Sequence, residues 1–173
     1  LAHHGRLGSL TATEKADGVT ADMLADFVSQ IYTQEAKVKR GSVEFLQYDD
    51  TYVLPREDDT SEDYGGVVEE RETLLFIPGL DFSGVSAVGQ YPELAQKYDV
   101  WWCRVSSDDR TLFSDLADTI AAFVAQDLSA SGKPITLLGE SFGGLLTVAV
   151  ALRLKDADAG KLQLPTSVSA EPI

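Results

Sequence analysis

Short, uninterrupted runs of apolar residues occur three times in the second half of the chain, and they predict buried strands. The runs cover residues 74–77, 100–103 and 135–138, and glycine follows the first and the third within two residues. Apolar runs of this length, bounded by turn-forming residues, are typical of strands that helices cover on both faces. The chain is therefore expected to contain a sheet that lies in its core.

Apolar residues at helical spacing predict two amphipathic helices. The clearer pattern begins at Thr111, which is expected to cap it, and ends at residues 131–134. Its apolar stripe consists of Leu112, Leu116, Ile120, Phe123, Val124 and Leu128. A second pattern runs from an expected cap at Thr20 to about Arg40, where Gly41 ends it. Positions three and four residues apart form one face of a helix, so both helices are expected to pack against other elements.

The remaining elements have weaker patterns. Residues 86–98 are compatible with a helix, although a glycine and a proline interrupt its middle. Residues 145–152 are apolar without a helix breaker and predict a further helix. The stretches 42–48 and 51–54 have strand composition around two aspartates, which favours a hairpin. Residues 162–170 suggest the beginning of one more strand.

Strands that alternate with helices at this spacing predict an α/β fold, with a parallel sheet flanked by helices. We expect an N-terminal arm and helix over residues 1–41 and a domain over residues 42–173, whose core is residues 73–173. Residues 1–20 show no sustained period and are expected to form a loose arm. The acidic stretch 56–72 is expected to form a solvated surface loop.

Composition sets the size of the domain and excludes several partners. With 173 residues, 44% of them hydrophobic, the chain can bury one ordinary core. Its formal net charge of −14 would repel phosphates, so no nucleic-acid partner is expected. No run approaches the roughly 18 apolar residues of an integral membrane segment, and peripheral contact with lipid stays open. The single cysteine, Cys103, is expected to be a small buried apolar residue.

The sharpest candidate for chemistry is the segment Gly139-Glu140-Ser141-Phe142-Gly143, between a predicted strand and a predicted helix. Strand, G-x-S-x-G and helix in this order are the context of a nucleophile elbow, in which a tight turn strains the serine backbone and exposes its hydroxyl. Gly139 and Gly143 are expected there because side chains would collide across the turn. Ser141 is thus the candidate nucleophile. The alternative is a glycine-rich turn that binds nothing.

A second loop is expected to complete this site. In open parallel sheets, ligands bind beyond the carboxyl ends of the strands, and residues 78–80 leave such an end. If the two strands are neighbours, this loop can direct a backbone N–H toward the space above Ser141. The N–H of Phe142, at the start of the following helix, can point to the same place. Together these donors would form an oxyanion hole for acyl transfer.

Three segments give the chain a resemblance to a known family. They are residues 75–81 (LFIPGLD), 108–113 (DDRTLF) and 139–144 (GESFGG). These segments resemble the esterase/lipase/thioesterase-like domain of the plant and algal phytyl ester synthase family, within the α/β-hydrolases. The resemblance covers about residues 73–173. The first and third segments are shared with many α/β-hydrolases, whereas the second is the narrower marker.

The resemblance implies both a fold and an activity. It implies the N-terminal part of an α/β-hydrolase fold that lacks its last strands, in a plastid enzyme that moves fatty acyl groups onto phytol or diacylglycerol. It also implies that Ser141 is the nucleophile and that Leu80 and Phe142 supply the N–H groups of the oxyanion hole. The family usually has aspartate before the serine, where this chain has Glu140.

One expected part of the site is absent from the sequence. A serine hydroxyl needs a histidine to take its proton, and an acid orients that histidine. No histidine follows Ser141, while His3 and His4 lie in the expected arm and receive no role. We expect a fragment whose histidine and acid lie beyond Ile173, so that this chain alone has little activity. The alternative is a non-catalytic binding module or inactive remnant with the same fold.

The hypothesis at this stage is therefore a serine-dependent hydrolase or acyltransferase, of the lipase or esterase kind. Its expected partner is a small-molecule acyl ester or acyl donor. No cofactor or metal is expected, because the chain has neither a phosphate-binding loop nor the spacing of a metal site. Asp109, Arg110 and Thr111 are expected to form a loop and a helix cap, and a substrate contact is the alternative. The sequence gives neither the acyl chain, the acceptor, the oligomeric state nor the compartment.

Overall fold

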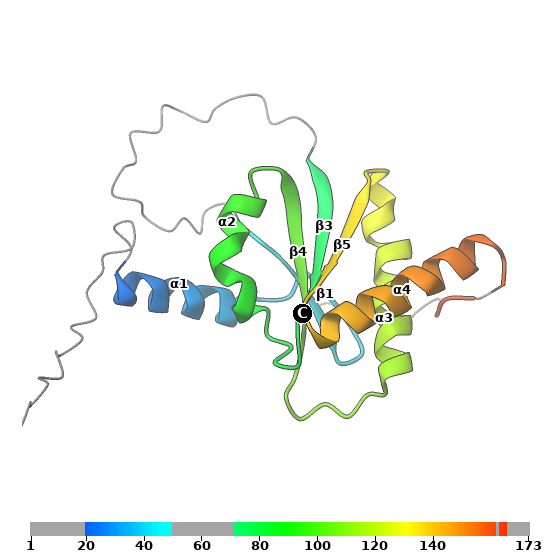
Figure 1. Cartoon of the computed structure of the whole chain (residues 1–173), viewed down its shortest axis with the longest axis horizontal. Helices are drawn as coiled ribbons and strands as arrows, with labels where there is room; N and C mark the ends of the chain where they lie inside the picture. The colour runs from blue at the N-terminus through cyan, green and yellow to red at the C-terminus, as the bar shows by residue number, and fades with distance from the viewer. Residues whose placement is uncertain (1–19, 50–70, 162, 166–173) are drawn as a thin grey trace, which may run out of the picture.

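A computed structural model describes residues 20–49, 71–161 and 163–165 of the chain. Its centre is a five-stranded mixed sheet in the order β1-β2-β4-β3-β5 (Figure 1). The strands are β1 (Val38–Arg40), β2 (Val43–Gln47), β3 (Glu72–Ile77), β4 (Tyr98–Val105) and β5 (Ile135–Gly139). The α/β class predicted from the sequence is confirmed, and the three apolar runs lie within β3, β4 and β5.

β3 occupies the middle of the parallel part of the sheet. It pairs in parallel with β4 on one side and with β5 on the other. β2 pairs antiparallel with β4, and β1 pairs antiparallel with β2. The carboxyl ends of β3, β4 and β5 therefore meet at one edge of the sheet, which brings together the loops that follow them.

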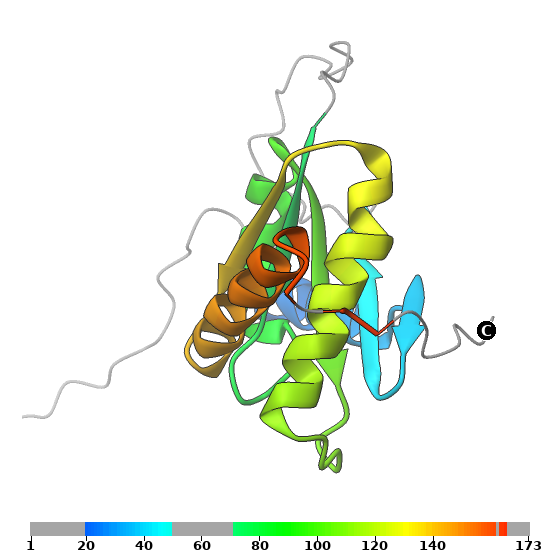
Figure 2. The same cartoon turned by 90° about the vertical axis from the view of Figure 1, so that its right-hand side faces the viewer.

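Helical layers cover both faces of this sheet (Figures 1 and 2). The helices are α1 (Ala21–Thr33), α2 (Tyr91–Leu94), α3 (Phe113–Gln126) and α4 (Phe142–Asp158), with 3₁₀ segments at Val85–Gln90 and Leu128–Ser131. Because strand side chains alternate between faces, Leu75 and Ile77 pack toward α3 and α4, whereas Leu74 and Phe76 pack toward α1 and α2. The sheet thus separates two apolar cores.

The first helix ends earlier than predicted. α1 begins at the expected cap, where Thr20 Oγ1 accepts a hydrogen bond from the Met23 N–H at 3.2 Å. It ends at Thr33 rather than near residue 40, because residues 38–40 pair with β2 as the strand β1. This pairing satisfies backbone groups along the edge of β2 that a longer helix would leave unpaired.

The hairpin lies earlier in the chain than predicted. Gly41, with φ 58°, forms the turn between β1 and β2 instead of ending a helix. Residues 51–54, the predicted second strand of the hairpin, lie outside the described residues. The predicted N-terminal arm with His3 and His4, and most of the acidic stretch 56–72, lie outside them too.

Three other elements differ from the sequence prediction. Residues 86–98 do not form one helix, because a 3₁₀ segment precedes the short α2, in whose first turn Pro92 lies. α4 starts before residue 145 and extends past residue 152. Of the strand suggested at 162–170, residues 163–165 have no regular structure, and the others lie outside the described residues.

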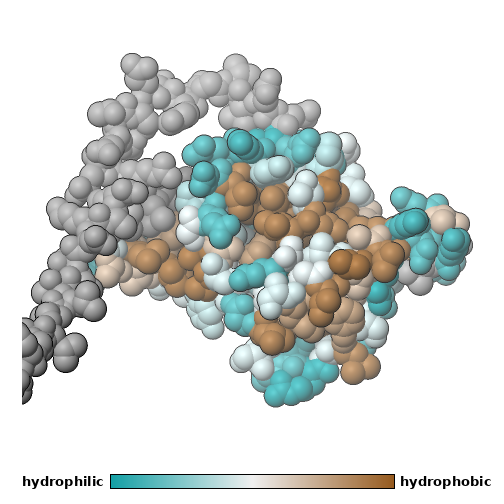
Figure 3. Space-filling view, in the orientation of Figure 1, coloured by the Kyte–Doolittle hydropathy of each residue, from teal (hydrophilic) through white to brown (hydrophobic). Residues whose placement is uncertain are grey.

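β5 and α4 expose an apolar face. Among the described residues, β5 pairs with β3 alone and so lies at the edge of the sheet. Figure 3 shows apolar residues gathered over these two elements. Its most exposed large side chains are Leu138, Leu145, Val148 and Leu152, which are 40–63% exposed. We call these four residues the β5–α4 face.

Candidate active site

The elbow, residues 139–143, joins the end of β5 to the start of α4. Ser141 occupies its apex with φ 53° and ψ −119°, a combination that residues other than glycine rarely adopt. Ser141 is also exposed. Strain of this kind costs on the order of 1–3 kcal/mol and persists only where the surrounding structure imposes it. The fold therefore holds Ser141 clear of the sheet in a strained backbone conformation.

Close packing around the turn leaves no room for side chains at the two outer glycines. A Cβ added to Gly143 would lie 2.0 Å from the Ile77 carbonyl oxygen and 2.3 Å from that of Pro78. A Cβ added to Gly139 would lie 2.2 Å from Thr147 Oγ1. The first turn of α4 thus rests directly on the end of β3, and glycine permits this close approach.

The loop after β3, residues 78–82, lies beside Ser141; we call it the β3 loop. β3 and β5 are neighbours, and Ile77 pairs with Gly139 at their carboxyl ends. A Cβ added to Gly79 would come within 3.6 Å of Ser141 Cβ. The neighbouring strands that the sequence analysis assumed are therefore present in the fold.

The two backbone donors expected from the sequence lie on either side of this contact. Leu80 follows Gly79 in the β3 loop, and Phe142 is the first residue of α4. The first N–H groups of a helix have no partner within the helix and carry a partial positive charge. Within the described residues, neither the Leu80 nor the Phe142 N–H donates a hydrogen bond. Neither N–H group therefore has a protein acceptor in the described part of the chain.

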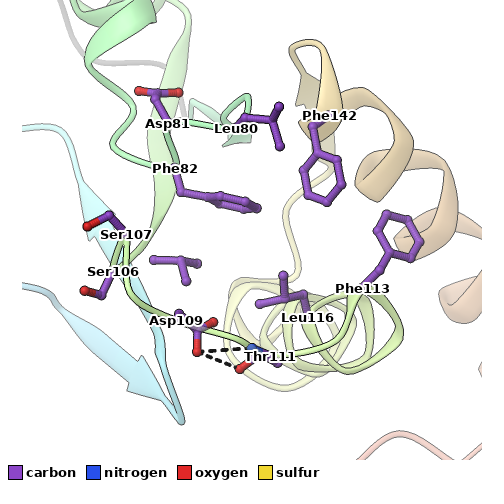
Figure 4. Close-up of a pocket in the computed structure, with 11 residues that line it drawn as sticks. Leu80, Asp81, Phe82, Ser106, Ser107, Asp109, Thr111, Phe113, Leu116 and Phe142 are labelled. Carbon is purple, nitrogen blue, oxygen red and sulfur yellow. Dashed lines mark hydrogen bonds between the residues drawn. The ribbon is translucent and has the colours of Figure 1, made fainter.

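A cavity of about 240 Å³ lies between the β3 loop, the loop after β4 and the start of α3. Its apolar lining residues are Leu80, Phe82, Val105, Phe113, Leu116 and Phe142, and its polar lining residues are Asp81, Ser106, Ser107, Asp109 and Thr111. Figure 4 shows the labelled apolar side chains converging, whereas the Asp81 carboxylate and the hydroxyls of Ser106 and Ser107 point away. The cavity therefore combines a cluster of apolar side chains with polar groups along its lining.

Phe142 connects the elbow to this cavity. Its ring makes edge-to-face contacts with Phe82 and Phe113, with centroid separations of 5.5 and 5.7 Å. Each such pair contributes about 0.5–1.5 kcal/mol beyond simple burial. The sequence indicates no role for Phe82 or Phe113, because their meeting depends on one loop, on the starts of two helices and on the positive φ of 46° at Phe82. No sequence pattern indicates that φ value.

The Asp109 carboxylate holds the loop after β4 in place through hydrogen bonds. Its carboxylate accepts hydrogen bonds from Ser42 Oγ at 3.1 Å and from Thr111 Oγ1 at 2.9 Å. Burial acts to raise the pKa of Asp109, but the hydrogen bonds from Thr111 and Ser42 outweigh it and lower the pKa below its usual value. Thr111 therefore does not cap α3 as predicted, since Leu112 occupies the N-cap position without a side-chain bond. Arg110 is exposed and donates to the Asp109 carbonyl at 2.7 Å.

Glu140 ties the elbow to the 3₁₀ segment that follows the β3 loop. Its carboxylate accepts a hydrogen bond from Ser86 Oγ at 2.7 Å. Its backbone N–H donates to the Ile77 carbonyl at 3.2 Å. The segment is itself anchored by the buried Tyr91 hydroxyl, which donates to the Gly84 carbonyl at 2.8 Å. Glu140 thus connects the elbow to the end of β3 and to the 3₁₀ segment after the β3 loop.

Other candidate groups offer no site among the described residues. Cys103 is buried as predicted, and burial raises the pKa of its thiol to about 12, so the thiol stays protonated and unreactive near neutral pH. The described residues contain no group of three or more acidic, histidine or cysteine side chains placed to hold a metal ion. Nor does any helix described here have the length and apolar character to cross a membrane.

Comparison with known proteins finds two curated relatives from Arabidopsis thaliana. The chain is 37% identical over 97 residues to phytyl ester synthase 1, chloroplastic, which is 56% of this chain and 14% of that protein. It is 33% identical over 86 residues to phytyl ester synthase 2, chloroplastic, which is 49% of this chain and 12% of that protein. No protein-family model matches the sequence, and no solved structure matches it.

These similarities support a relationship with the phytyl ester synthases, as the three sequence segments suggested. The matched regions span only about one eighth to one seventh of the two relatives. The similarity therefore bears on the family of this chain, and the activity of the relatives as whole proteins enters only as a proposal.

Proposed function

We propose that Ser141 is the nucleophile of an α/β-hydrolase-type site that transfers the acyl group of a lipid ester to an alcohol or to water. The observation that carries the proposal is the strained, exposed position of Ser141 at a strand-to-helix turn. That backbone conformation is typical of a nucleophile elbow, in which the N–H of the residue after the nucleophile is one donor of the oxyanion hole. The free N–H groups of Leu80 and Phe142 beside Ser141 support the same function.

In the proposed reaction, Ser141 Oγ attacks the carbonyl carbon of the ester. A bond forms between Oγ and that carbon, and the bond between the carbon and the leaving alcohol breaks. The Oγ proton passes through a general base to the departing alcohol. The N–H groups of Leu80 and Phe142 would stabilise the negative charge on the carbonyl oxygen, each by about 3 kcal/mol. An acceptor alcohol or water then takes the acyl group and restores Ser141.

The general base is not among the described residues. Histidine usually fills this role, but no histidine follows Ser141, and His3 and His4 lie outside the described part of the chain. The proposal therefore requires a base from outside the described residues. The same observation favours a second candidate function, a binding module that keeps the cavity without performing the reaction.

The substrate class and the compartment are proposed from the two relatives. Both are named as chloroplastic phytyl ester synthases. We extend to this chain the formation of an ester between a fatty acyl group and a long-chain alcohol such as phytol, in the chloroplast. The apolar side chains that line the cavity, Leu80 and Phe142 among them, are consistent with a lipid substrate.

The test is acyl transfer by the full-length protein from a labelled acyl lipid to phytol, with hydrolysis followed in parallel. Ser141→Ala is expected to reduce both rates at least a thousandfold, because no other group supplies the attacking oxygen. Ser129→Ala, at an exposed serine of the 3₁₀ segment Leu128–Ser131, serves as the matched control. Full activity in Ser141→Ala would refute the nucleophile assignment. A folded wild-type protein that binds lipid esters without turnover would favour the binding module.

A further inference from the structure

Two residues other than glycine have a positive φ among the described residues, and both lie in segments that form the candidate site. They are Ser141, with φ 53°, and Phe82, with φ 46°. A bulky aromatic residue rarely adopts this conformation, which persists only where the surrounding structure imposes it. The proposed chemistry explains the strain at Ser141 but not at Phe82. We propose that Phe82 is a positioning residue, which orients the Leu80 N–H and couples it to the start of α4. This inference rests on the proposed function of Ser141.

Hydrogen bonds hold the backbone of Phe82 on both sides. Its N–H donates to the Gly79 carbonyl at 3.0 Å, and its carbonyl accepts a hydrogen bond from the Val105 N–H at 3.1 Å. The first of these bonds closes a β-turn over residues 79–82. The second ties this turn to Val105, the last residue of β4. The strained residue therefore both closes the turn and fixes it against the sheet.

The turn also sets the direction of the Leu80 N–H. The Gly79 carbonyl and the Leu80 N–H belong to one planar trans peptide unit, in which they point in opposite directions. Because the carbonyl faces the Phe82 N–H, the Leu80 N–H points away from the interior of the turn. A Cβ added to Gly79 would lie 3.6 Å from Ser141 Cβ, so this peptide unit lies beside the proposed nucleophile. Opening of the turn would let the unit rotate and misdirect its donor.

The Phe82 ring joins this turn to the second proposed donor. It contacts the Phe142 ring edge to face, with the centroids 5.5 Å apart, and Figure 4 shows it pointing toward that ring. Both rings pack against the core that α3 and α4 cover. Phe142 begins α4 and supplies the other proposed N–H. The packing of one ring thus imposes the strained φ of Phe82 and couples the two segments that carry the donors.

The test compares two esters in the full-length protein, 4-nitrophenyl butyrate and its thiono analogue, in which sulfur replaces the carbonyl oxygen. In both reactions Ser141 Oγ bonds to the carbon, its proton passes to the general base, and 4-nitrophenolate leaves. Sulfur is a weak hydrogen-bond acceptor, so well-aimed donors favour the oxo ester. Phe82→Ala is expected to lower the oxo-to-thiono ratio of kcat/KM by about tenfold or more. Phe82→Tyr keeps the ring and is expected to keep the ratio.

Two further variants separate this role from a general effect on packing. Phe113→Ala is the matched control, because Phe113 also contacts the Phe142 ring, at 5.7 Å, but belongs to α3. It is expected to change both rates alike and leave their ratio unchanged. Phe82→Gly removes the ring but accepts a positive φ without strain, so its ratio is expected to lie between those of the wild type and Phe82→Ala. If Phe82→Ala does not fold, a lowered ratio in Phe82→Gly supports the proposal.

A wild-type ratio in the folded alanine and glycine variants of Phe82 would overturn its positioning role and leave Ser141 as the proposed nucleophile. An equal fall of the ratio in Phe113→Ala would overturn it as well, because the effect would then belong to the aromatic cluster as a whole. The proposed function and this inference fail together in two cases. One is hydrolysis of both esters by Ser141→Ala at the rate of the wild type, and the other is hydrolysis of neither ester by the wild type.

Discussion

At the scale of the residue, the backbone of Ser141 stores strain that has no benefit for stability. Its φ of 53° and ψ of −119° are imposed by the β3–α4 contact on one side and by β5 on the other. Glycine would adopt the same conformation at little cost. Such strain is concentrated at functional sites, where the position of a side chain outweighs the stability that is lost. The strained backbone therefore holds the Ser141 hydroxyl in an exposed position at the turn.

This interpretation predicts the relative stability of two variants that both lack the hydroxyl. Ser141→Ala keeps a Cβ in the strained conformation, whereas Ser141→Gly removes it. Glycine should relieve about 1–3 kcal/mol of strain and lose about 0.5–1 kcal/mol to the entropy of the unfolded chain. The free energy of unfolding in urea is therefore expected to be about 1 kcal/mol higher for Ser141→Gly than for Ser141→Ala. An equal or lower value for the glycine variant would contradict the strain.

At the scale of the element, the site depends on how closely α4 approaches β3. The N-terminal turn of α4 touches the carbonyl groups of Ile77 and Pro78 through Gly143. This contact brings the start of α4, with Phe142, close to the β3 loop. The hydrogen bond between Ser86 and Glu140 joins the same two segments from the other side. The geometry of the proposed oxyanion hole is thus set by packing between elements.

Alanine substitutions at two neighbouring glycines distinguish the effect of this packing on stability from the effect of helix propensity. Gly143→Ala should push α4 from β3, because its Cβ would lie 2.0 Å from a backbone oxygen, and lower the free energy of unfolding by about 2 kcal/mol. Gly144→Ala meets its nearest atom at 3.6 Å and should be neutral or stabilising by up to about 1 kcal/mol. Thermal and urea unfolding of both variants provide the measurement. Equal effects at both positions would show that the close approach does not matter.

At the scale of the whole molecule, one sheet supports two cores and leads three loops to a single edge. On one face, the Phe45 and Phe123 rings stack with their centroids 3.7 Å apart. On the other, Tyr91 stacks on Trp102 at 5.1 Å. These aromatic contacts anchor the sheet to α3 and to α2, the layers between which the loops after β3, β4 and β5 emerge. The candidate site lies where these three loops meet.

The sequence predicted the parts of this arrangement that depend on local patterns. Apolar runs located β3, β4 and β5, and the glycine spacing located the turn between β5 and α4, because buried strands and tight turns constrain their own residues. It failed where tertiary pairing decides the outcome. Residues 38–40 continue a helical pattern, yet pairing with β2 makes them a strand. The hydroxyl of Thr111 could cap a helix, yet it donates a hydrogen bond to the Asp109 carboxylate instead. The cavity around Phe142 draws on three loops and has no local signature.

As the proposed nucleophile, Ser141 forms a covalent bond to the acyl group during turnover. The most direct measurement is a rapid acid quench of the full-length protein during reaction with a slow ester, followed by peptide mass spectrometry. We expect the mass of the acyl group on the peptide that contains Ser141 in the wild type, and on no peptide in Ser141→Ala. Turnover with the acyl group on a different residue would contradict it, as would turnover in Ser141→Ala with no covalent intermediate at all.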